Sequence, residues 1–483
     1  MESAPRQVPP PGSRRANSIE RLVLPPAVGP RTSTMGRRVA SVVGMGARSV
    51  IRFQFAGTGR HTRRVRHTVG GMNANGAEPQ ESPSEDPLLD LHRAWSQRAE
   101  QARTQTVPGV ERPGAAEGHR TGGGAEPHWI RWGEGEKAPP VVAMFDAVEL
   151  EYAAFRRGVA VVDQTQRGCI QICGADAEDL LERLLTQKIG GMKEGEVRDS
   201  FRTSRKGRVE DDLRVIRRAS DFIVVSDVGF SEATAEAIEA FMFGEDVEIK
   251  RPSWRSIGLY GPKATEALAA GLNAVGDGAE AVLLVDEPAC QGAEVLVRID
   301  VVRAFWGAVT EIKNARPAGW FAQNLIRLEA GQPRFGIDFN HEFLPHETDL
   351  VHRRVSFTKG CYPGQEVVAR MQHLADGATK RRVVGFHFPA GEVPPAGAPI
   401  LRDEEGAPGE VLGQVTSSGP SPMASSRGIG LGVLVKAAKD ADLLVVNEDG
   451  PGRVTVVARS ELVPPVLREE QSDEGNSVEG NDS

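Results

Sequence analysis

The first residues that could do chemistry lie in Lys206–Leu213 (KGRVEDDL), where a glycine turn leads into acidic residues at the start of an expected strand. Neighbouring strand residues point to opposite faces, so only one of Asp211 and Asp212 can face a central cavity. The other would face outward or cap a turn. An acid inside such a cavity could position or protonate an amine. A solvated acidic strand end is the competing interpretation.

A third acidic residue, Glu294, opens a largely apolar strand in Gly292–Val295 (GAEV). A carboxylate there could accept the paired N–H donors of a planar ring such as a pterin through a bidentate hydrogen bond. The plainer interpretation is a glutamate on the surface.

Two cationic groups and one acid surround Gly331 in Arg327–Gly336 (RLEAGQPRFG). In one interpretation, Glu329 pairs with Arg327 or Arg334 and holds a loop. In the other, the loop lines a binding site on a rigid scaffold. The sequence favours neither over the other.

The sharpest motif is Val355–Arg370 (VSFTKGCYPGQEVVAR). Pro363 fits the first turn of a helix expected from Gly364 to about Gln372, which places Cys361 just before its N-terminus. The positive helix end and Lys359 would both favour the thiolate form. Cys361 is therefore a candidate reactive cysteine. A buried thiol in a tight glycine turn is the alternative.

Metal and nucleotide sites are not predicted. The four cysteines include no CxxC pair, which argues against a disulfide scaffold and a structural zinc site. Cys169 and Cys173 would share one face of a strand and pack as small apolar residues. His341, His346 and His352 match no zinc spacing, and no phosphate loop or dinucleotide fingerprint stands out.

Charge is distributed unevenly along the chain. Residues 1–71 contain 13 arginines, no lysine and two acidic residues, so the remainder carries 45 basic against 64 acidic side chains. A core this acidic has no general electrostatic reason to attract a phosphate backbone. We therefore expect no direct contact with tRNA, unless charge is locally segregated. The sequence has no apolar stretch of membrane-spanning length.

The elements that must position these residues alternate between strands and single helices. GCIQICG reads as a strand, and Asp176 caps a helix with a buried stripe from Ala177 to Leu185. DLRVI and DFIVVSD follow as strands, then a helix capped by Ser231, then the strand EVLVRI and a helix over Val301–Lys313. This pattern predicts α+β layers.

The chain divides into five expected parts. Residues 1–71 form a disordered extension, read as an over-extended start before Met72 or as a transit peptide. Residues 72–140 form a disordered linker with one short helical stretch at Pro87–Arg103, and 141–375 form the main domain. Short strands RRVVGFHF, VLGQVTSS, IGLGVLV, DLLVV and GRVTVVA predict a small β-barrel over 376–470. Residues 471–483 form an acidic tail.

Taken in order, these segments resemble the folate-binding aminomethyltransferase (GcvT-like) superfamily. The resemblance runs from about Glu149 to Pro465 and rests on GADAEDLLERLLTQ, KGRVEDDLRV, GAEV, RLEAGQPRFG, VTSSGPSP and IGLGVL. Within it, KGCYPGQE is similar to the K-G-C-Y-x-G-Q-E signature of YgfZ-type proteins. The signature residues are Lys359, Gly360, Cys361, Tyr362, Gly364, Gln365 and Glu366.

The resemblance implies α/β subdomains in a ring around a folate channel, followed by a barrel. It implies tetrahydrofolate, or a one-carbon-substituted folate, held by Asp211, Asp212 and Glu294, with Arg327 and Glu329 as further binding residues. Cys361 would lie near the channel mouth and join Asp211 and Asp212 in any chemistry.

The YgfZ branch implies an accessory role in iron–sulfur cluster assembly or repair, with iron–sulfur proteins or their assembly factors as partners and a link to tRNA modification. Gln323 stands where similarity to glycine-cleavage T-proteins would place a substrate-contacting arginine, which puts aminomethyl transfer in doubt. A tetrahydrofolate-dependent aminomethyltransferase is the alternative, so the sequence leaves turnover open. The expected location is cytoplasmic, or the mitochondrial matrix if residues 1–71 are a transit peptide.

Overall fold

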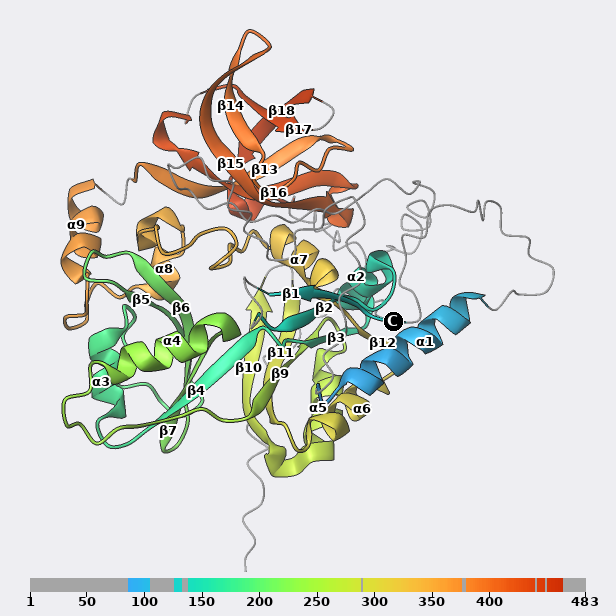
Figure 1. The fold of residues 1–483 in the computed structure, drawn as a ribbon, viewed down its shortest axis with the longest axis vertical. Coiled ribbons are helices and arrows are strands. Elements are labelled where there is room, and N and C mark those ends of the chain that lie inside the picture. Colours follow the sequence, from blue (N-terminus) through green and yellow to red (C-terminus); the bar gives the residue numbers. More distant parts are fainter. Residues whose placement is uncertain are drawn as a thin grey trace, which may run out of the picture. The chain divides into compact units, whose positions relative to one another are not determined.

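A computed structural model describes residues 86–104, 126–132, 138–287, 290–375, 379–438, 441–447 and 450–463. These residues form two mixed layers of sheet and helix and a closed barrel (Figure 1). The predicted α+β class is confirmed. The expected extension over 1–71 and tail over 471–483 lie outside the described residues.

The first sheet is covered by helices on both faces. On β3, Val159 and Val161 pack with α5 and α6, whereas Ala160 and Val162 pack with α2 and α7. This explains why the strand reads as a continuous apolar run rather than an alternating one. The strand order is β10 (Ala279–Glu287), β11 (Cys290–Arg298), β9 (Trp254–Tyr260), β3 (Val159–Asp163) and β12 (Ala315–Pro317), and the helices are α2 (Val148–Arg157), α5 (Ala264–Val275), α6 (Val302–Thr310) and α7 (Trp320–Glu329).

The second sheet is antiparallel and has its two helices on one face. The predicted helix after Asp176 is confirmed as α3, and α4 begins three residues before the predicted Ser231 cap. Apolar residues of both helices pack on alternate residues of the strands. The strand order is β5 (Val197–Thr203), β6 (Val209–Arg217), β7 (Asp221–Asp227), β4 (Arg167–Cys173) and β8 (Glu248–Lys250), with α3 (Ala177–Leu184) and α4 (Val228–Glu239).

The two sheets meet through a small apolar cluster. Ile223 and Val225 of β7 pack with Leu283 of β10 and Leu296 of β11. Cys169, on β4, packs partly buried against the same cluster, in agreement with its predicted packing role. Polar residues of both sheets surround the cavity described below.

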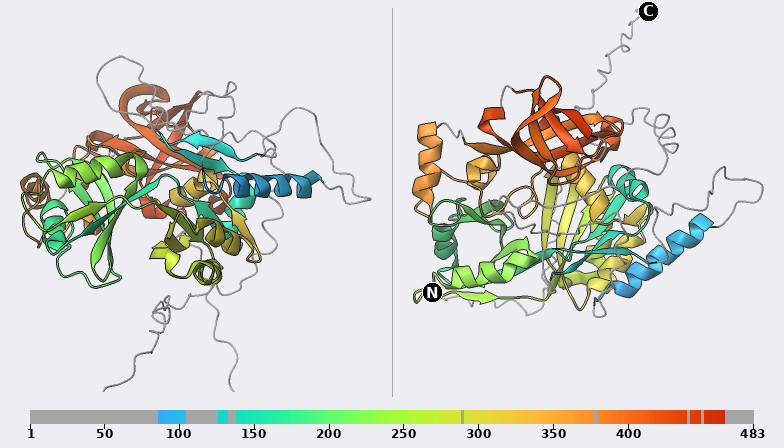
Figure 2. Two further views of the ribbon diagram at one scale, coloured as in Figure 1. Left: turned by 60° about the horizontal axis from the view of Figure 1, so that its bottom comes forward. Right: turned by 45° about the horizontal axis from the view of Figure 1, so that its top comes forward.

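The C-terminal barrel is confirmed, with one more strand than the sequence suggested (Figure 2). Phe386, Ile400, Val415 and Val445 fill its interior. Gly432 permits tight packing, because a Cβ there would lie 2.3 Å from the Gln414 carbonyl oxygen. The strands are β13 (Arg381–Ala390), β14 (Pro399–Glu404, not predicted), β15 (Ala407–Ser421), β16 (Arg427–Val435), β17 (Leu443–Asn447) and β18 (Gly450–Val457).

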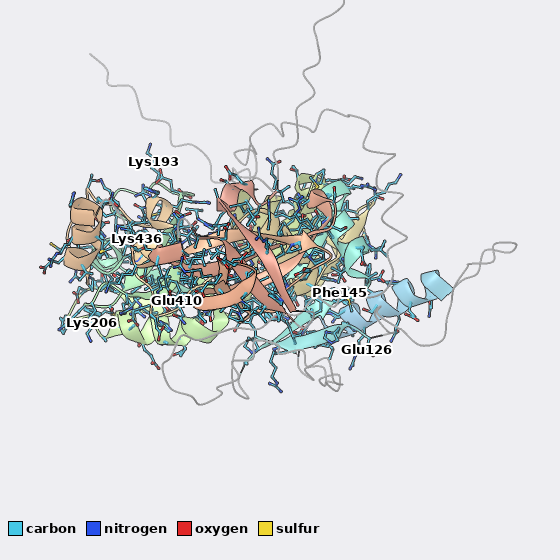
Figure 3. All side chains as sticks on the ribbon, turned by 90° about the horizontal axis from the view of Figure 1, so that it is seen from above. Glu126, Phe145, Lys193, Lys206, Glu410 and Lys436 are labelled. Carbon is cyan, nitrogen blue, oxygen red and sulfur yellow. The ribbon has the colours of Figure 1, made fainter. Side chains whose placement is uncertain are left out.

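The expected linker over 72–140 needs correction in two stretches. Helix α1 (Leu89–Thr104) and strand β1 (His128–Arg131), which pairs with β2 (Pro140–Met144), belong to the folded body. Helix α1 docks through the Trp95 ring against Phe145, and Arg93 bonds Glu126 near the start of β1 (Figure 3). Apolar contacts thus offset the ordering entropy here. The short helical stretch predicted at Pro87–Arg103 corresponds to α1.

Candidate functional site

A cavity of about 860 Å³ lies between the two sheets. Its walls come from β5, β6 and β7 of one sheet, β10 and β11 of the other, and helix α7. Further lining residues come from other elements and loops: Phe155, Arg167, Gln187, Lys188, Tyr260, Ala330, residues 332–335, Arg353, Arg354 and Ser356. The volume falls within the range usual for small-molecule sites.

Strand β6 obeys the alternation that the sequence predicted. Asp211 shares its face with Leu213 and Val215, which pack toward α3 and α4, and its carboxylate accepts a hydrogen bond from Arg202 Nε at 2.5 Å. Asp212 lies on the opposite face. Both residues contribute atoms to the cavity wall, but Asp212 is the one whose side chain shares the cavity face of the strand.

The Asp212 carboxylate belongs to a chain of alternating charges. Arg354, on α8 (Val351–Arg354), donates to both of its oxygens, at 2.5 and 3.2 Å. Arg354 also lies 3.8 Å from Asp199, which accepts from Arg214 at 2.9 Å. Arg214 in turn donates to Glu294 at 3.2 Å. Burial raises the pKa of Asp212, and the Arg354 guanidinium opposes that rise.

Glu294, which the sequence assigned to ligand binding, lies buried in the wall opposite β6. It accepts hydrogen bonds from Tyr260 Oη at 2.7 Å and Gln164 Nε2 at 3.3 Å. Burial opposes its ionisation, but the guanidinium groups of Arg167 and Arg214 lower its pKa to about 2. The carboxylate is therefore charged at neutral pH. A ligand would use the lone pairs that these donors leave.

Helix α7 presents one face to the cavity, with Trp320, Gln323 and Ile326 along it. The Gln323 Oε1 atom is buried and accepts no hydrogen bond from any described residue. Arg327 also reaches the wall, but its donors are occupied by Asn324 Oδ1 at 2.7 Å, Ser417 Oγ at 2.9 Å and the Asp338 carboxylate. Its contacts support the interpretation in which this arginine holds a loop.

Glu329 does not take the ligand-binding role that the resemblance implied. It lies outside the cavity lining and accepts from Tyr152 Oη at 2.7 Å, Ser421 Oγ at 2.6 Å and the Arg156 guanidinium. Of the two partners predicted for Glu329, Arg327 pairs with Asp338 instead, and the described ion-pair partner of Glu329 is Arg156. Glu329 instead ties α2 and α7 to the barrel.

The signature segment places its thiol away from the cavity. Cys361 is exposed and is not among the lining residues. Tyr362 is buried instead, and Gly364, at a φ of +82°, presses against the Lys206 turn, where a Cβ would lie 2.3 Å from Ser204 O. The following helix, α9, spans Gln365–Ala375. The expectation of a thiol at the channel mouth is therefore corrected.

Lys359 is also not available to the thiol. Its side chain is fully buried, and Nζ donates to the carbonyl oxygens of Leu185 at 2.6 Å and Gln187 at 3.3 Å and to that of Glu182. Burial lowers the pKa of Lys359. Lys359 thus caps the C-terminal end of helix α3 and holds the adjacent Gln187–Lys188 segment in place. That segment lines the cavity.

Arginines are the site residues that the sequence analysis missed. For Arg214 the sequence did contain a signal. A hairpin that closes at the Lys206–Gly207 turn pairs residues at equal distances on either side of the turn. This register places Asp199 opposite Arg214, as it places Phe201 opposite Asp212. Arg354 gave no such signal, since it reaches Asp212 from a distant segment.

The histidines of residues 341–352 do not converge on one point. The His341 ring packs against Phe335, and a ring nitrogen of His346 lies 3.2 Å from Gln372 Oε1. Among the described residues, no group of three His, Cys, Asp or Glu side chains is placed to hold a metal ion. None of the described helices is long and apolar enough to span a membrane.

Comparison with known proteins places these features in a family context. Residues 95–281 match the family model described as the GCVT N-terminal domain. An aminomethyltransferase from Rubrobacter xylanophilus is 27% identical over 329 residues, which cover 64% of this chain and 85% of the relative. An aminomethyltransferase from Streptomyces coelicolor is 27% identical over 293 residues, covering 56% and 77%.

The fold is shared with a solved structure. The crystal structure of glycine cleavage system aminomethyltransferase T from Bartonella henselae superposes with a TM-score of 0.61 at 20% sequence identity, covering 69% of this chain and 94% of that one. The comparisons thus support the GCVT-domain relationship and an aminomethyltransferase-like fold. They do not single out the YgfZ-type branch, and the names of the relatives favour the transferase alternative.

Proposed function

We propose, on the premise of a GCVT-type domain and an aminomethyltransferase-like fold, that the chain binds tetrahydrofolate in this cavity and transfers a one-carbon unit to or from it. The observation that carries the proposal is the pair of carboxylates, Asp212 and Glu294, which two different sheets bring to one cavity. Arg354 and Arg214 hold these carboxylates in place.

The cavity suits a folate in size and in chemistry. Trp320, Tyr260 and Phe155 contribute aromatic side chains to the lining, which pack well against a planar ring. Glu294 is a charged acceptor, and Gln323 Oε1 is a neutral acceptor to which no described residue donates. Both match the N–H groups at the edge of a pterin. When bound, tetrahydrofolate supplies the amine nitrogens that carry the one-carbon unit.

Of the two candidate acids, Asp212 fits the proton-handling role. Burial raises its pKa, so it holds a proton more readily than an exposed aspartate does. Arg354 opposes this rise in the pKa of Asp212, because its guanidinium stabilises the ionised carboxylate. We therefore assign ligand orientation to Glu294, proton transfer to Asp212 and positioning of Asp212 to Arg354. Asp211 supports the strand from its other face.

Calorimetry of the full chain with tetrahydrofolate tests the proposal. Loss of a charge-assisted hydrogen bond costs about 1.5–3 kcal/mol, so Glu294→Gln should weaken binding by about tenfold or more. Asp212→Asn should leave binding closer to that of the wild type. Glu410→Gln, an exposed carboxylate on the barrel (Figure 3), is the matched control. Absence of any binding heat in the wild type, supported by equilibrium dialysis, would overturn the proposal.

Transfer itself is tested with a lipoylated carrier protein loaded with an aminomethyl group. The wild type should form one-carbon-substituted folate, and Asp212→Asn should lower the turnover number while it leaves the folate Kd within about threefold. An active T-protein serves as the positive control. If the control turns over and this chain binds folate without turnover, the transferase assignment is wrong and the folate-binding one stands.

A second candidate function is supported by the exposed Cys361. An accessible thiol on a turn fixed by Tyr362 and Gly364 can react with partners outside the cavity. This agrees with a folate-dependent accessory role in the maintenance of iron–sulfur proteins, the partners that the YgfZ-like signature implies.

Replacement of Cys361 separates this role from folate binding. Cys361→Ala should lower the activity of iron–sulfur enzymes in cells that depend on this protein, while calorimetric folate affinity stays unchanged, because the thiol lies outside the cavity. Cys173→Ala, a half-exposed thiol on β4, is the control. Unchanged iron–sulfur enzyme activity in the Cys361→Ala strain would remove the candidate.

A further inference from the structure

The hairpin of β1 and β2 lies beside helix α7, which forms one wall of the cavity (Figure 1). Trp132 directly follows β1, and its backbone N–H donates to the Pro139 carbonyl oxygen at 2.9 Å, which extends the pairing of the hairpin. Its side chain is 6% exposed and packs with Trp320 and Phe321, at the start of α7. Trp132 is not among the residues that line the cavity. Any effect that it has on a ligand must therefore act through a neighbour.

That neighbour is Arg334, which does line the cavity. Its guanidinium carbon lies 4.6 Å from the ring centroid of Trp132 and 5.2 Å from that of Trp320. The two indole rings have their centroids 4.6 Å apart, at an interplanar angle of 86°. The guanidinium therefore lies in a right-angled corner formed by one ring from the hairpin and one from α7.

The backbone of Arg334 is fixed as well. Its N–H donates to the Asp338 carboxylate at 2.9 Å, and its carbonyl oxygen accepts from the backbone N–H groups of Ile337 at 3.1 Å and Asp338 at 2.8 Å. Asp338 is in turn buried and paired with Arg327. With the backbone held in this turn, the remaining freedom of Arg334 lies in its side chain, which the two rings restrict.

Indole rings suit this role because they hold a guanidinium without using its donors. A cation is attracted to the face of an aromatic ring, and tryptophan gives the strongest attraction. The five N–H groups of a guanidinium lie in its plane, so contacts with ring faces do not use them. An arginine held in this way keeps one orientation in a cavity wall, whereas an unrestrained side chain loses rotamer entropy when it binds a ligand.

We propose that Trp132 is a positioning residue of the ligand site, which holds Arg334 in the cavity wall so that its guanidinium donates to the bound ligand. The inference rests on the proposed function, in which that ligand is a tetrahydrofolate. A pterin carries acceptor atoms, among them a ring carbonyl oxygen, and a buried acceptor needs a donor. Glu294 and Gln323 supply acceptors to the cavity, and Arg334 supplies donors. Arg334 thus follows the second interpretation of Arg327–Gly336, in which the loop lines a binding site.

Calorimetry of tetrahydrofolate binding to the full chain tests the inference with three variants. Arg334→Leu should weaken binding by about tenfold or more, through loss of a charged donor. Trp132→Leu, which removes the ring and leaves the arginine, should weaken binding by about three- to tenfold. Trp132→Phe keeps a ring face toward the guanidinium and should stay within about twofold of the wild type. This order separates the ring contact from simple filling of the core, because leucine and phenylalanine are both apolar.

A double-variant cycle separates positioning from general damage to the fold. If Trp132 acts through Arg334, Trp132→Leu should change the affinity of an Arg334→Leu protein by less than about twofold. Additive losses of affinity would show that Trp132 supports the site in another way, and would overturn the inference. Denaturant unfolding is measured alongside, since loss of a buried indole should lower stability in both backgrounds alike.

Trp95→Leu is the matched control, because Trp95 also stacks with an arginine, Arg316, whose guanidinium carbon lies 5.1 Å from the ring centroid. Neither of these two residues is among those that line the cavity. The control should lose stability and keep the wild-type affinity for tetrahydrofolate. An equal loss of affinity in the control would overturn the inference.

Arg334→Leu carries the test if Trp132→Leu does not fold. Wild-type affinity in Arg334→Leu would overturn the inference alone and leave the proposed function intact, because the cavity would still bind folate. A wild type that binds no tetrahydrofolate would refute the proposed function, and the inference with it.

Discussion

The side-chain carbonyl oxygen of Gln323 is buried in the cavity wall without a donor among the described residues. A buried acceptor left unsatisfied costs about 1–3 kcal/mol relative to a satisfied one. This cost is recovered when a ligand N–H, or a water, reaches the atom. Under the proposed function, this unsatisfied acceptor favours the ligand-bound protein over the ligand-free one.

Gln323→Met tests this arrangement, because methionine has similar volume and no strong acceptor. We expect the free energy of unfolding of the ligand-free protein to rise by up to about 1 kcal/mol and tetrahydrofolate affinity to fall severalfold. Denaturant unfolding and calorimetry measure the two effects. Gln323→Glu keeps an acceptor and should retain more affinity. Unchanged binding in Gln323→Met would show that the atom does not contact the ligand.

At the scale of single residues, the sequence predicted the acidic residues of the cavity wall better than the arginines that pair with them. Strand alternation predicted that Asp211 and Asp212 lie on opposite faces of β6, but Asp211 is buried rather than turned outward, and both acids contribute to the cavity lining. Glu294 was placed in the wall as expected. Glu329 was not, because chain spacing near the end of a helix does not tell which neighbour the side chain meets. Arg354 was missed for the same reason, since its partner lies 142 residues away.

At the scale of elements, helix α1 depends on one buried histidine. His92 is fully buried among the rings of Trp129, Phe145 and Trp306. Its Nε2 atom lies 3.5 Å from the Asp163 carboxylate, on β3. Arg255 lies 2.8 Å from the same carboxylate and also pairs with Asp86, just before the helix. A change in the protonation of His92 or Asp163 should therefore change how stably α1 docks on the sheet.

The two groups respond to pH in opposite directions. Burial lowers the pKa of His92 from 6.5 to about 3, so its contribution to stability is lost as the pH falls below about 6.5. Burial raises the pKa of Asp163 from 3.8 to about 7, so its contribution is lost as the pH rises from about 4 to 7. Between pH 4 and 6.5 the two slopes oppose each other.

His92→Phe should expose the Asp163 slope alone. We expect the stability of the variant to fall as the pH rises from 4 to 7, by up to about 1 kcal/mol per pH unit, whereas the wild type changes less. Thermal unfolding at several pH values measures this. His373→Phe, a histidine on α9, is the control. Parallel pH profiles for His92→Phe and the wild type would contradict the account.

Periodicity predicted the elements with strong apolar stripes. The helix expected over Val301–Lys313 is α6, which buries Val302, Phe305, Trp306 and Val309 at the spacing of a single apolar face. The helical stretch expected at Pro87–Arg103 is α1, but its docking to the folded body and strand β1 were not predicted, because this part of the chain looks too polar to fold alone. Both elements are ordered because the rest of the chain supplies their apolar partners, which local composition does not reveal.

At the scale of the whole molecule, a buried arginine ties the barrel to the helical layer. Arg327 of α7 bonds Ser417 of β15 and pairs with Asp338, and Asp338 also accepts from Thr416 Oγ1 at 2.7 Å. Arg327 and Asp338 are both buried. Loss of one partner from a buried ion pair costs about 3–5 kcal/mol, mostly through the charge left behind.

Arg327→Met should therefore lower the free energy of unfolding by about 3–5 kcal/mol. The double variant Arg327→Met, Asp338→Asn should recover part of this loss, since no buried charge remains unpaired. Chemical denaturation of the four proteins in the cycle gives the coupling. Strict additivity of the two single effects would show that the pair does not act as a unit.

Strand spacing predicted a barrel, but neither its sixth strand nor its attachment could be derived. The segment of β14 is short and lies between glycine and acidic residues, so its alternation is weak. The attachment rests on contacts between residues about 80 to 90 positions apart, such as Asp338 with Ser417 and Glu329 with Ser421. Such pairs follow from the assembled fold and not from any local pattern.

The alternating charges from Arg354 through Asp199 and Arg214 to Glu294 have a practical consequence for mutagenesis. Truncation of any one member leaves a neighbour with the wrong partner, so a one-at-a-time alanine scan will rank all of them as indispensable. Such a ranking reports how these four side chains neutralise one another's charge, and not which of them contacts a bound molecule. Only replacements that remove one positive and one negative group together can tell the two apart.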